Sequence, residues 1–314
     1  MGEPLILAGD LGGTKTLLAL AELTAAGPRI LGEARYDSRS YASFPDLLAD
    51  FLDRRQTIAA ACFGLAGPTD GRQARLTYLP WQLDADDLGL RFDLSRVHLA
   101  NDFAAAAHGL ELLDPGQLQP LQSGRPVLQG PRLILGAGTG LGVAGLVHEN
   151  GRYRVIPGEG GHMGFAPQTG QQHALWQHLH ARTGRVTTED VVSGPGIARI
   201  HGFLGGDAAD PATIGHRALT GGDPVATATI ELWLAAYGAF AGDLALHWLA
   251  RGGVFIAGGI AAKLLPKWSP AAFLDAFNAK REHADLAAEM PIQLVTEERL
   301  GLLGALALAA RQAS

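Results

Sequence analysis

The sequence contains a glycine-rich turn at residues 9–16, GDLGGTKT, between two apolar segments, 5–8 and 17–23, that are typical of strands. Glycine tolerates positive φ and lets backbone N–H groups approach an anion with no Cβ in the way. Asp10 and Thr14 add oxygens suited to magnesium or phosphate. A phosphate-binding hairpin and an ordinary tight turn both explain this segment, so it leaves the two interpretations open.

Asn101 and Asp102 follow a predicted strand at 97–100 and precede an alanine-rich helix predicted over 103–112. A carboxylate at the end of a strand can accept a proton from a substrate hydroxyl. A helix N-cap is the alternative role for Asp102, because aspartate is common at that position. The local pattern is compatible with either.

A second polar segment, PGEGGH at residues 157–162, carries a carboxylate and an imidazole on backbone flanked by glycines. Glu159 and His162 could bind neighbouring hydroxyls of one small ligand, and a solvated polar loop is the alternative. Glu189 is expected in the first turn of a short helix that Thr187 caps with Asp190 as its partner. A negative charge at that position interacts favourably with the helix dipole, and this is the simpler interpretation of Glu189.

The glycine turn of the N-terminus has an architectural counterpart at residues 136–142, GAGTGLG, between predicted strands at 132–136 and 142–148. A third strand is predicted at 152–156, and a later strand at 253–257 leads into Gly258 and Gly259. A duplicated strand, glycine turn and strand predicts two related sheets that face one nucleotide across a cleft between domains.

The remaining pattern predicts a mixed sheet in the first hundred residues, with a strand at 29–36, a helix at 45–54, a strand at 57–64 and a strand pair ending at Ala100. Residues 114–131 are rich in proline, glycine and glutamine and are expected to connect two domains. Helices are expected at 173–182, 196–204, 211–219 and 224–250, around a small second sheet. A final helix, about 301–311, is expected to pack back on the first domain.

Composition excludes several classes of protein. The 314 residues suit two domains, and 47% hydrophobic content suffices for sizeable cores. The net charge is −6, the chain has no Lys/Arg run, and 7% of its residues are aromatic. The sequence therefore lacks the basic patch that is typical of nucleic-acid-binding proteins. The apolar run at 302–310 is shorter than the ~18 residues that a membrane span needs, and no signal-like start is present, so neither secretion nor a membrane is expected.

Cysteine and histidine usage argues against disulfide and metal frameworks. The single Cys62 lies in an apolar run and is expected to be a buried hydrophobe in a reducing compartment, which favours the cytoplasm. His173, His178 and His180 are spaced five and two residues apart, not the four that places two ligands on one helix face. We therefore expect surface histidines rather than a metal site.

Together these segments resemble the bacterial glucokinase family, sugar kinases of the actin-like ATPase superfamily. The matching motifs are collinear from Gly9 to Gly304: GDLGGT at 9–14, NDF at 101–103, GAGTGLG at 136–142, PGEGGH at 157–162, SGPG at 193–196, FIAGGI at 255–260 and GLLG at 301–304. The resemblance implies an α/β fold of two actin-like (ribonuclease H-like) domains, with mixed sheets flanked by helices, that close on ATP and a hexose. The expected domains are 1–110 with the C-terminal helix 300–314, and 111–299.

The resemblance also implies roles for individual residues in phosphorylating the 6-hydroxyl of glucose. Asp102 resembles the family's general base. The residues that resemble its remaining hydroxyl-binding groups are Asn101, Glu159, His162 and Glu189. Two turns resemble the family's phosphate-binding hairpins, one with Gly12, Gly13 and Thr14 and the other with Gly138, Thr139 and Gly140. The segment of Gly258 and Gly259 resembles the family's loop beside the adenosine. Asp10 is the expected indirect partner of Mg²⁺. A cytoplasmic homodimer is typical of the family.

Two departures from the family pattern leave alternatives open. Lys15 stands where these glucokinases often carry asparagine, and DLGGTK is similar to the related repressor/kinase family; whether Lys15 assists a phosphate or is solvated stays open. That family's cysteine-rich zinc motif is missing, because MGFAP follows His162. Three alternatives to a glucokinase remain: a kinase of broader specificity for mannose, glucosamine or other hexoses, a sugar-responsive regulator, and a chaperone-like ATPase. The regulator would need a DNA-binding module, for which the first strand, starting by residue 5, leaves no room.

Overall fold

The computed structural model describes residues 3–52, 57–77 and 79–313 and divides into two compact units. Unit 1 contains the described residues up to Asp114 and from Glu297 onward, and unit 2 contains Pro115–Thr296. The end of the helix predicted at 45–54 and the last residue of the one predicted at 300–314 lie outside the described residues.

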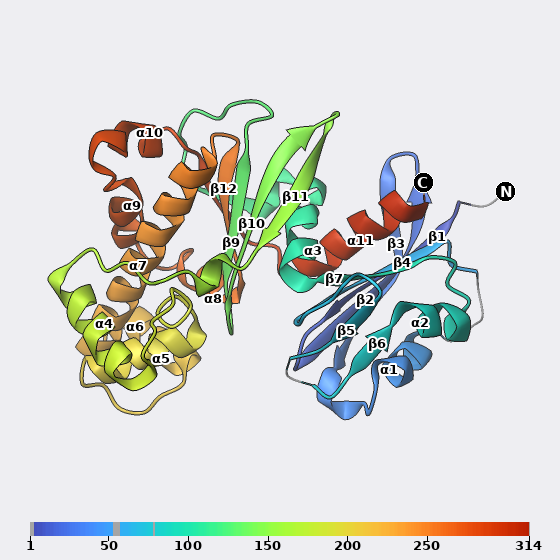
Figure 1. Cartoon of the computed structure of the whole chain (residues 1–314), viewed down its shortest axis with the longest axis horizontal. Coiled ribbons are helices and arrows are strands. Elements are labelled where there is room, and N and C mark those ends of the chain that lie inside the picture. The colour runs from blue at the N-terminus through green and yellow to red at the C-terminus, as the bar shows by residue number, and fades with distance from the viewer. Residues whose placement is uncertain (1–2, 53–56, 78, 314) are drawn as a thin grey trace. The chain divides into compact units, whose positions relative to one another are not determined.

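Unit 1 is built on a five-stranded mixed sheet in the order β3-β2-β1-β4-β7 (Figure 1). The strands β1, β2 and β3 are antiparallel neighbours, whereas β1, β4 and β7 run parallel. Its strands are β1 Leu5–Leu11, β2 Lys15–Thr24, β3 Gly27–Asp37, β4 Ala60–Leu65 and β7 Val97–Asn101, with a separate hairpin of β5 Gln73–Arg75 and β6 Gln82–Asp84.

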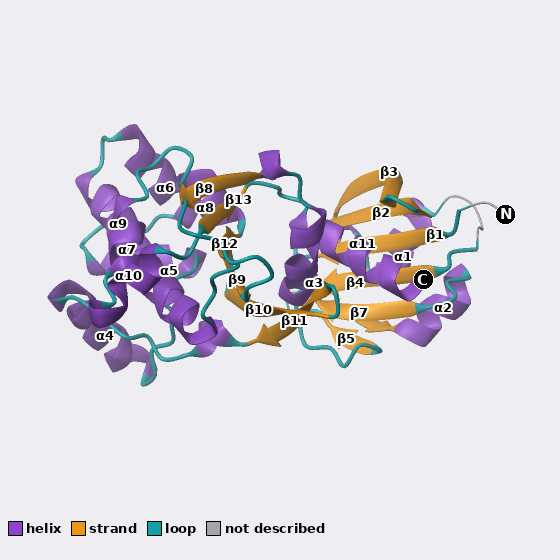
Figure 2. Cartoon of the chain, turned by 90° about the horizontal axis from the view of Figure 1, so that it is seen from above, coloured by secondary structure: helices purple, strands orange, loops and turns teal. Residues whose placement is uncertain are grey.

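Helices cover both faces of this sheet and create two cores. The helices are α1 Phe44–Phe51, α2 Ala85–Phe92, α3 Asp102–Gly109 and α11 Leu300–Ala313. Phe44 and Leu88, from α1 and α2, belong to one core, and Cys62 and Leu306 belong to the other, beneath α3 and α11. Figures 1 and 2 show α11 beside β1 and β4, which it contacts. The predicted burial of Cys62 is confirmed.

Unit 2 repeats the same strand pattern with one strand added at its edge. Its sheet has the order β11-β10-β9-β12-β13-β8, in which β11, β10 and β9 are antiparallel neighbours and β9, β12 and β13 are parallel. The strands are β8 Leu118–Gln122, β9 Arg132–Ala137, β10 Leu141–Glu149, β11 Arg152–Gly158, β12 Gly253–Ala257 and β13 Ile292–Val295. The predicted duplication is therefore real at the level of topology.

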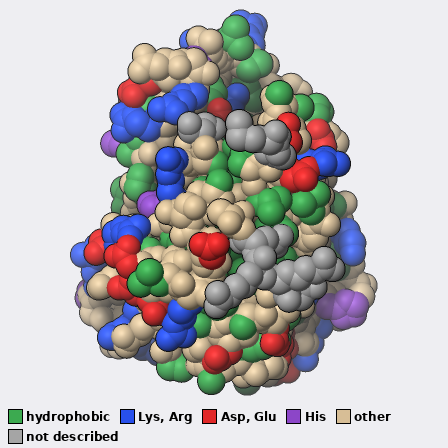
Figure 3. Space-filling view, turned by 90° about the vertical axis from the view of Figure 1, so that its right-hand side faces the viewer, with side chains coloured by type: hydrophobic (Ala, Val, Ile, Leu, Met, Phe, Trp, Pro, Cys, Tyr) green, Lys and Arg blue, Asp and Glu red, His purple; other side chains and the backbone are tan. Residues whose placement is uncertain are grey.

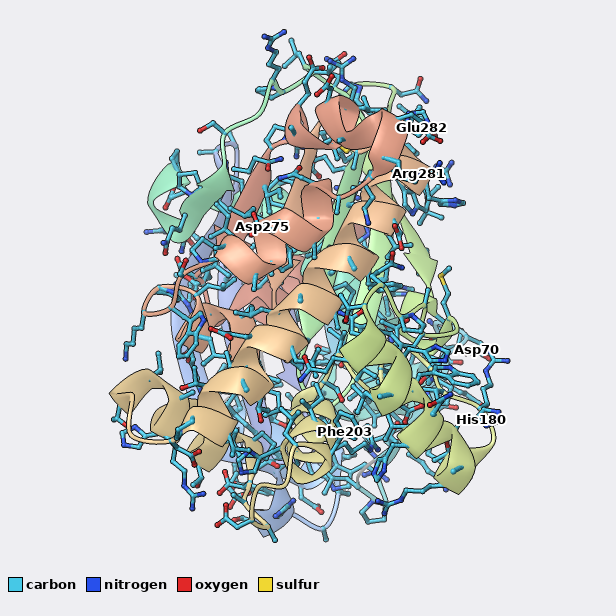
Figure 4. The ribbon with its side chains drawn as sticks, turned by 90° about the vertical axis from the view of Figure 1, so that its left-hand side faces the viewer. Asp70, His180, Phe203, Asp275, Arg281 and Glu282 are labelled. Atoms are coloured by element: carbon cyan, nitrogen blue, oxygen red, sulfur yellow. The ribbon has the colours of Figure 1, made fainter. Side chains whose placement is uncertain are left out.

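The long helix α7, Pro224–Trp248, is the core helix of unit 2. It begins with Asp223 accepting from two backbone N–H groups and Pro224 at the first position, as predicted. Among the described residues it is the one helix long and apolar enough to cross a membrane, but 67% of its most apolar window is buried in the protein. It runs alongside α9, the helix that carries Asp275 in Figure 4. The other helices are α4 Gly170–Thr183, α5 Gly194–Phe203, α6 Pro211–Thr220, α8 Gly259–Leu264, α9 Ala271–Asn278 and α10 Ala284–Ala288.

Several predicted elements are wrong in detail. The strand pair expected before Ala100 is a single strand preceded by α2, whose N-cap Asp84 accepts from two N–H groups. The expected connector at 114–131 contains β8, which pairs with β13 despite a proline in its middle, because β8 is an edge strand. The expected small sheet of unit 2 has six strands.

On the face drawn in Figure 3, acidic and basic side chains are interspersed and form no basic stripe. The exposed side chains of His173, His178 and His180 lie on α4, and Figure 4 shows His180 at its outer surface. The described residues contain no group of three or more possible metal ligands of the His, Cys, Asp and Glu types.

The close contact of α11 with α3 depends on Gly304, because a Cβ there would overlap the carbonyl oxygen of Ala105. We expect Gly304→Ala to lower the free energy of unfolding by about 1–3 kcal/mol, the usual cost of overpacking a core. Denaturant unfolding measures the change. Gly32→Ala is the matched control, because a Cβ at Gly32 in β3 has nothing within 4 Å. Equal stability of the two variants would contradict the close packing.

Candidate active site

In unit 1 the predicted functional residues gather where the parallel strands end. The register pairs Asp10 with Gly64 and Gly64 with Ala100, so β1, β4 and β7 finish side by side. Ligands of open α/β sheets bind outside the carboxyl ends of such strands. A Cβ at Gly64 would lie 3.1 Å from the Ala105 Cβ, so glycine at this position allows β4 to lie close to the first turns of α3, where Asp102 is.

The structure separates the roles of Asn101 and Asp102. Asn101 is the N-cap of α3, because its Oδ1 accepts from the N–H groups of Phe103 and Ala104 at 3.0 and 3.1 Å. Asp102 occupies the first helical position and also accepts from the Phe103 N–H, at 2.8 Å. The alternative that Asp102 is the N-cap is therefore wrong. With Oδ1 of Asn101 committed to the cap, its amide nitrogen is the atom that can donate to a ligand.

Asp10 has a pKa raised from 3.8 to about 6, because it is desolvated and faces the negative charge of Asp102, while Lys15 opposes the shift. Its carboxylate lies against α11: a Cβ at Gly301 would be 2.7 Å from Oδ2. Lys15 is partly buried rather than fully solvated, and it acts electrostatically on Asp10. Two acidic groups with one nearby cation form a site that favours a further positive charge.

The first glycine turn joins β1 to β2 without the positive φ that the sequence suggested. Neither Gly12 nor Gly13 has a positive φ. Gly12 is needed because its N–H donates to the Lys15 carbonyl at 3.0 Å, and a Cβ would lie 2.9 Å from that same oxygen. Glycine here serves close approach, which is the property that phosphate binding uses.

The second glycine turn, Gly138, Thr139 and Gly140, joins β9 to β10 in unit 2. The Gly138 N–H donates to the Gly140 carbonyl, and the Gly138 carbonyl accepts from the Gly194 N–H at the start of α5, each at 2.8 Å. Thr139 is exposed at the tip. Gly258, at the end of β12, has φ of +89° and would overlap the Ala137 carbonyl if it carried a Cβ, so the Gly258–Gly259 segment lies directly beside this turn.

Glu189 lies in a turn, not in the short helix that was expected. Thr187 and Asp190 do form the predicted reciprocal pair, but the chain continues through turns until α5 begins at Gly194. The Glu189 Oε2 accepts from the Leu141 N–H at 2.8 Å, directly after the second glycine turn. A Cβ at Gly140 would be 2.7 Å from the same oxygen.

Glu159 and His162 lie on a loop attached to the Glu189 turn. The Gly161 carbonyl accepts from the Glu189 N–H at 2.9 Å, and a Cβ at Gly161 would overlap the Leu141 carbonyl. Glu159 and His162 are 86% and 61% exposed, with Oε2 and Nε2 3.9 Å apart. Both side chains are therefore open to a ligand, while the backbone beneath them is fixed.

An apolar pocket of about 400 Å³ lies behind this loop, lined by Met163, Phe165, Phe240 and Trp248 among others. None of the predicted hydroxyl-binding residues lines it. Its walls offer few donors and acceptors for a sugar, so we do not assign the hexose to it.

Within unit 1 the structure brings together Asp10, Asn101 and Asp102, and within unit 2 it brings together the second glycine turn, Gly258, the Glu159 loop and Glu189. Sequence reasoning missed the residues that hold these groups. Ser193 Oγ donates to the Glu189 carbonyl at 2.7 Å, and Ser38 Oγ donates to the Gly12 carbonyl at 2.8 Å. The SGPG motif contained Ser193, but no local pattern marked Ser38.

The raised pKa of Asp10 predicts an unusual pH dependence of stability. The Asp10 carboxyl has a pKa of about 6 in the folded state and an ordinary value of 3.8, so it holds its proton more tightly when folded. Its ionisation therefore weakens folding by about 3 kcal/mol as the pH rises through that window. Asp10→Asn removes this effect. We expect the variant to be more stable than the parent chain at pH 8 and to lose that advantage at pH 4, as measured by denaturant unfolding. An advantage that is equal at both pH values would contradict the raised pKa.

Comparisons with known proteins match nearly the whole chain. The family model described as Glucokinase matches residues 7–312. A glucokinase of Nostoc punctiforme is 37% identical, with 98% of this chain and 99% of that protein aligned, and one of Synechocystis is 36% identical, with 97% and 98% aligned. The crystal structure of a glucokinase from an Antarctic psychrotroph is 30% identical, has a TM-score of 0.87 and covers 98% of this chain and 99% of its own. This chain belongs to the glucokinase family.

Proposed function

We propose that this chain transfers the γ-phosphoryl group of ATP to the 6-hydroxyl of D-glucose, giving glucose 6-phosphate and ADP, with Asp102 as general base. Membership of the glucokinase family supports the reaction. The observation that carries the assignment of the base is the position of Asp102, a carboxylate at the end of β7 beside Asp10 and at the same edge as the first glycine turn. A phosphoryl acceptor needs a base at its hydroxyl, and an edge of this kind is where α/β proteins bind ligands.

The helix position of Asp102 suits a base. The N-terminus of α3 favours negative charge, and the Phe103 N–H stabilises the carboxylate by a hydrogen bond. In the reaction, Asp102 accepts the proton of the 6-hydroxyl while the 6-oxygen of the sugar forms a bond to the γ-phosphorus. The bond from that phosphorus to the bridging oxygen breaks, and ADP leaves with the electron pair. Little other covalent chemistry is required of the protein.

The phosphate groups are assigned to the glycine turns. The backbone N–H groups of these turns can approach an anion, and the residues concerned are Gly12, Gly13 and Thr14 in the first turn and Gly138, Thr139 and Gly140 in the second. The adenosine is proposed to lie beside Gly258 and Gly259. The residues at Asp10 fit a magnesium ion, because this carboxyl is desolvated and repelled by Asp102. Asp10 would hold Mg²⁺ indirectly, and the ion neutralises phosphate charge when bound.

The proposed sugar ligands are Asn101, Asp102, Glu159, His162 and Glu189, which offer both donors and acceptors. Glu189 differs from the others, because one of its oxygens already accepts from the backbone that follows the second glycine turn. Its Oε1 is the atom proposed to contact the sugar. Glu189 thus connects hexose binding to the geometry of a phosphate turn, whereas Glu159 is exposed and has no such contact.

Glucose as the preferred hexose, over mannose or glucosamine, is supported by the family assignment and not by any single side chain. We also propose that the protein is a cytoplasmic homodimer that serves glycolysis, as is typical of its family. Its fully buried, unpaired Cys62 suits a reducing compartment.

Asp102→Asn tests the base. We expect kcat to fall by about 10²- to 10⁴-fold, because the amide cannot accept the proton, while the Kd for glucose stays within a few-fold of the parent value. A coupled assay for ADP release gives kcat, and calorimetric titration gives the Kd. The control is Asp275→Asn, since Asp275 is exposed on α9 in unit 2 (Figure 4). Near-normal turnover by Asp102→Asn would remove Asp102 from this role.

Glu189→Ala and Glu159→Ala form a second test. We expect Glu189→Ala to raise the KM for both glucose and ATP, because it frees the Leu141 N–H and loosens the turn next to it. Glu159→Ala should raise only the KM for glucose. Each lost hydrogen bond to a charged group corresponds to about a tenfold effect or more. Steady-state kinetics with each substrate varied in turn measures both, and an unchanged KM for ATP in Glu189→Ala would contradict the coupling.

A further inference from the structure

Two hydroxyl groups are buried next to the first glycine turn. Thr16 on β2 and Ser38, directly after β3, are both 0% exposed. Most of their buried neighbours on β2 are apolar, such as Leu18 and Ala19. Burying a hydroxyl without a partner costs free energy, so this pair requires an explanation.

Ser38 makes three contacts that converge on the turn. Its N–H donates to the Thr14 carbonyl at 3.0 Å, its Oγ donates to the Gly12 carbonyl at 2.8 Å, and its Oγ lies 2.9 Å from the Thr16 Oγ1. A hydroxyl has one proton, and that of Ser38 is used on Gly12. Thr16 must therefore donate to Ser38, which gives a directed chain from Thr16 through Ser38 to Gly12.

This chain fixes the orientation of peptide groups in the turn. The peptide between Gly12 and Gly13 is trans and planar, so its N–H points opposite to its carbonyl. Because the Gly12 carbonyl is held by Ser38, the Gly13 N–H is directed away from Ser38 and from the buried pair. The Gly12 N–H is already used by the Lys15 carbonyl. Of the two glycine N–H groups in this turn, that of Gly13 is therefore the one left to meet an anion.

We propose that the buried Thr16–Ser38 pair is a positioning device that presets the first glycine turn so that the Gly13 N–H meets a phosphate group of the nucleotide. The inference rests on the proposed function in that it takes ATP as the ligand of this turn. Neither hydroxyl touches the nucleotide. A turn held in its binding conformation before binding loses less conformational entropy on binding, so the pair contributes to nucleotide affinity and not to sugar affinity.

Ser38→Ala removes the donor to Gly12 and leaves Thr16 without its acceptor. We expect the Kd of a non-hydrolysable ATP analogue, measured by calorimetric titration without sugar, to rise about tenfold. The KM for ATP should rise similarly, while the KM for glucose stays within about twofold. Thr16→Val, which leaves the bond to Gly12 intact, should have a smaller effect of the same kind, and Thr16→Ser should restore the parent values.

The matched control is Thr229→Val in unit 2. Thr229 is also 0% exposed, and its hydroxyl donates to the Val225 carbonyl at 2.7 Å and lies near His201. Thr229 has no contact with either glycine turn. The Thr229→Val substitution should therefore lower the melting temperature without changing the Kd of the analogue. This separates loss of a buried hydrogen bond in general from loss of the one at the turn.

The outcomes are distinct. Weaker analogue binding in Ser38→Ala, absent from Thr229→Val, supports the proposal. An unchanged Kd, or equal rises in the KM values for both substrates, overturns it. If Ser38→Ala does not fold, the comparison of Thr16→Val with Thr16→Ser decides by the same criterion. A parent chain that binds the analogue but releases no ADP with any hexose would overturn the proposed function, and the Kd series would still test the positioning device.

Discussion

The hydrogen bond from the Leu141 N–H to the Glu189 carboxylate constrains most of the candidate site in unit 2. It requires glycine at 140, because any side chain there would displace the acceptor. The backbone of the same residue joins the second glycine turn to the loop of Glu159 and His162, since the Glu189 N–H donates to the Gly161 carbonyl. Glu189 therefore holds one proposed phosphate turn through its carboxylate and the backbone beneath two proposed sugar ligands through its N–H, and Ser193 Oγ donates to its carbonyl.

Both units present a glycine turn on the same strand topology, but different side chains support the turn in each unit. Each presents a glycine turn between two antiparallel strands, followed by parallel strands that end beside it. In unit 2 the turn is supported by an ionisable side chain and by the start of α5. In unit 1 it is supported by two buried hydroxyls, and Asp10 lies nearby with a pKa raised first by its desolvation and then by the negative charge of Asp102. The two sheets thus share a strand order, while the side chains that support their turns differ.

Sequence reasoning found the elements with strong local signals. The helix starting at Pro224, the strand at 253–257 and both glycine hairpins are present as predicted. It failed where tertiary contacts decide. The β8 segment is a strand because it pairs with β13 at the edge of the sheet, and the turn around Glu189 is held by N–H groups of Thr188 and Glu189 that donate to the Met163 and Gly161 carbonyls. Asp102 could be found beside its strand, but Ser38 could not, because its importance arises from a turn 26 residues earlier in the chain.

The central claim is that this chain phosphorylates glucose with ATP. The most direct measurement is kcat/KM for ADP release with ATP and magnesium across a panel of hexoses, with the phosphorylated carbon of the product located by NMR. We expect a strong preference for glucose and a phosphate on the 6-oxygen. ADP release that is unaffected by any hexose would contradict it, and phosphorylation at another carbon would contradict the role given to Asp102.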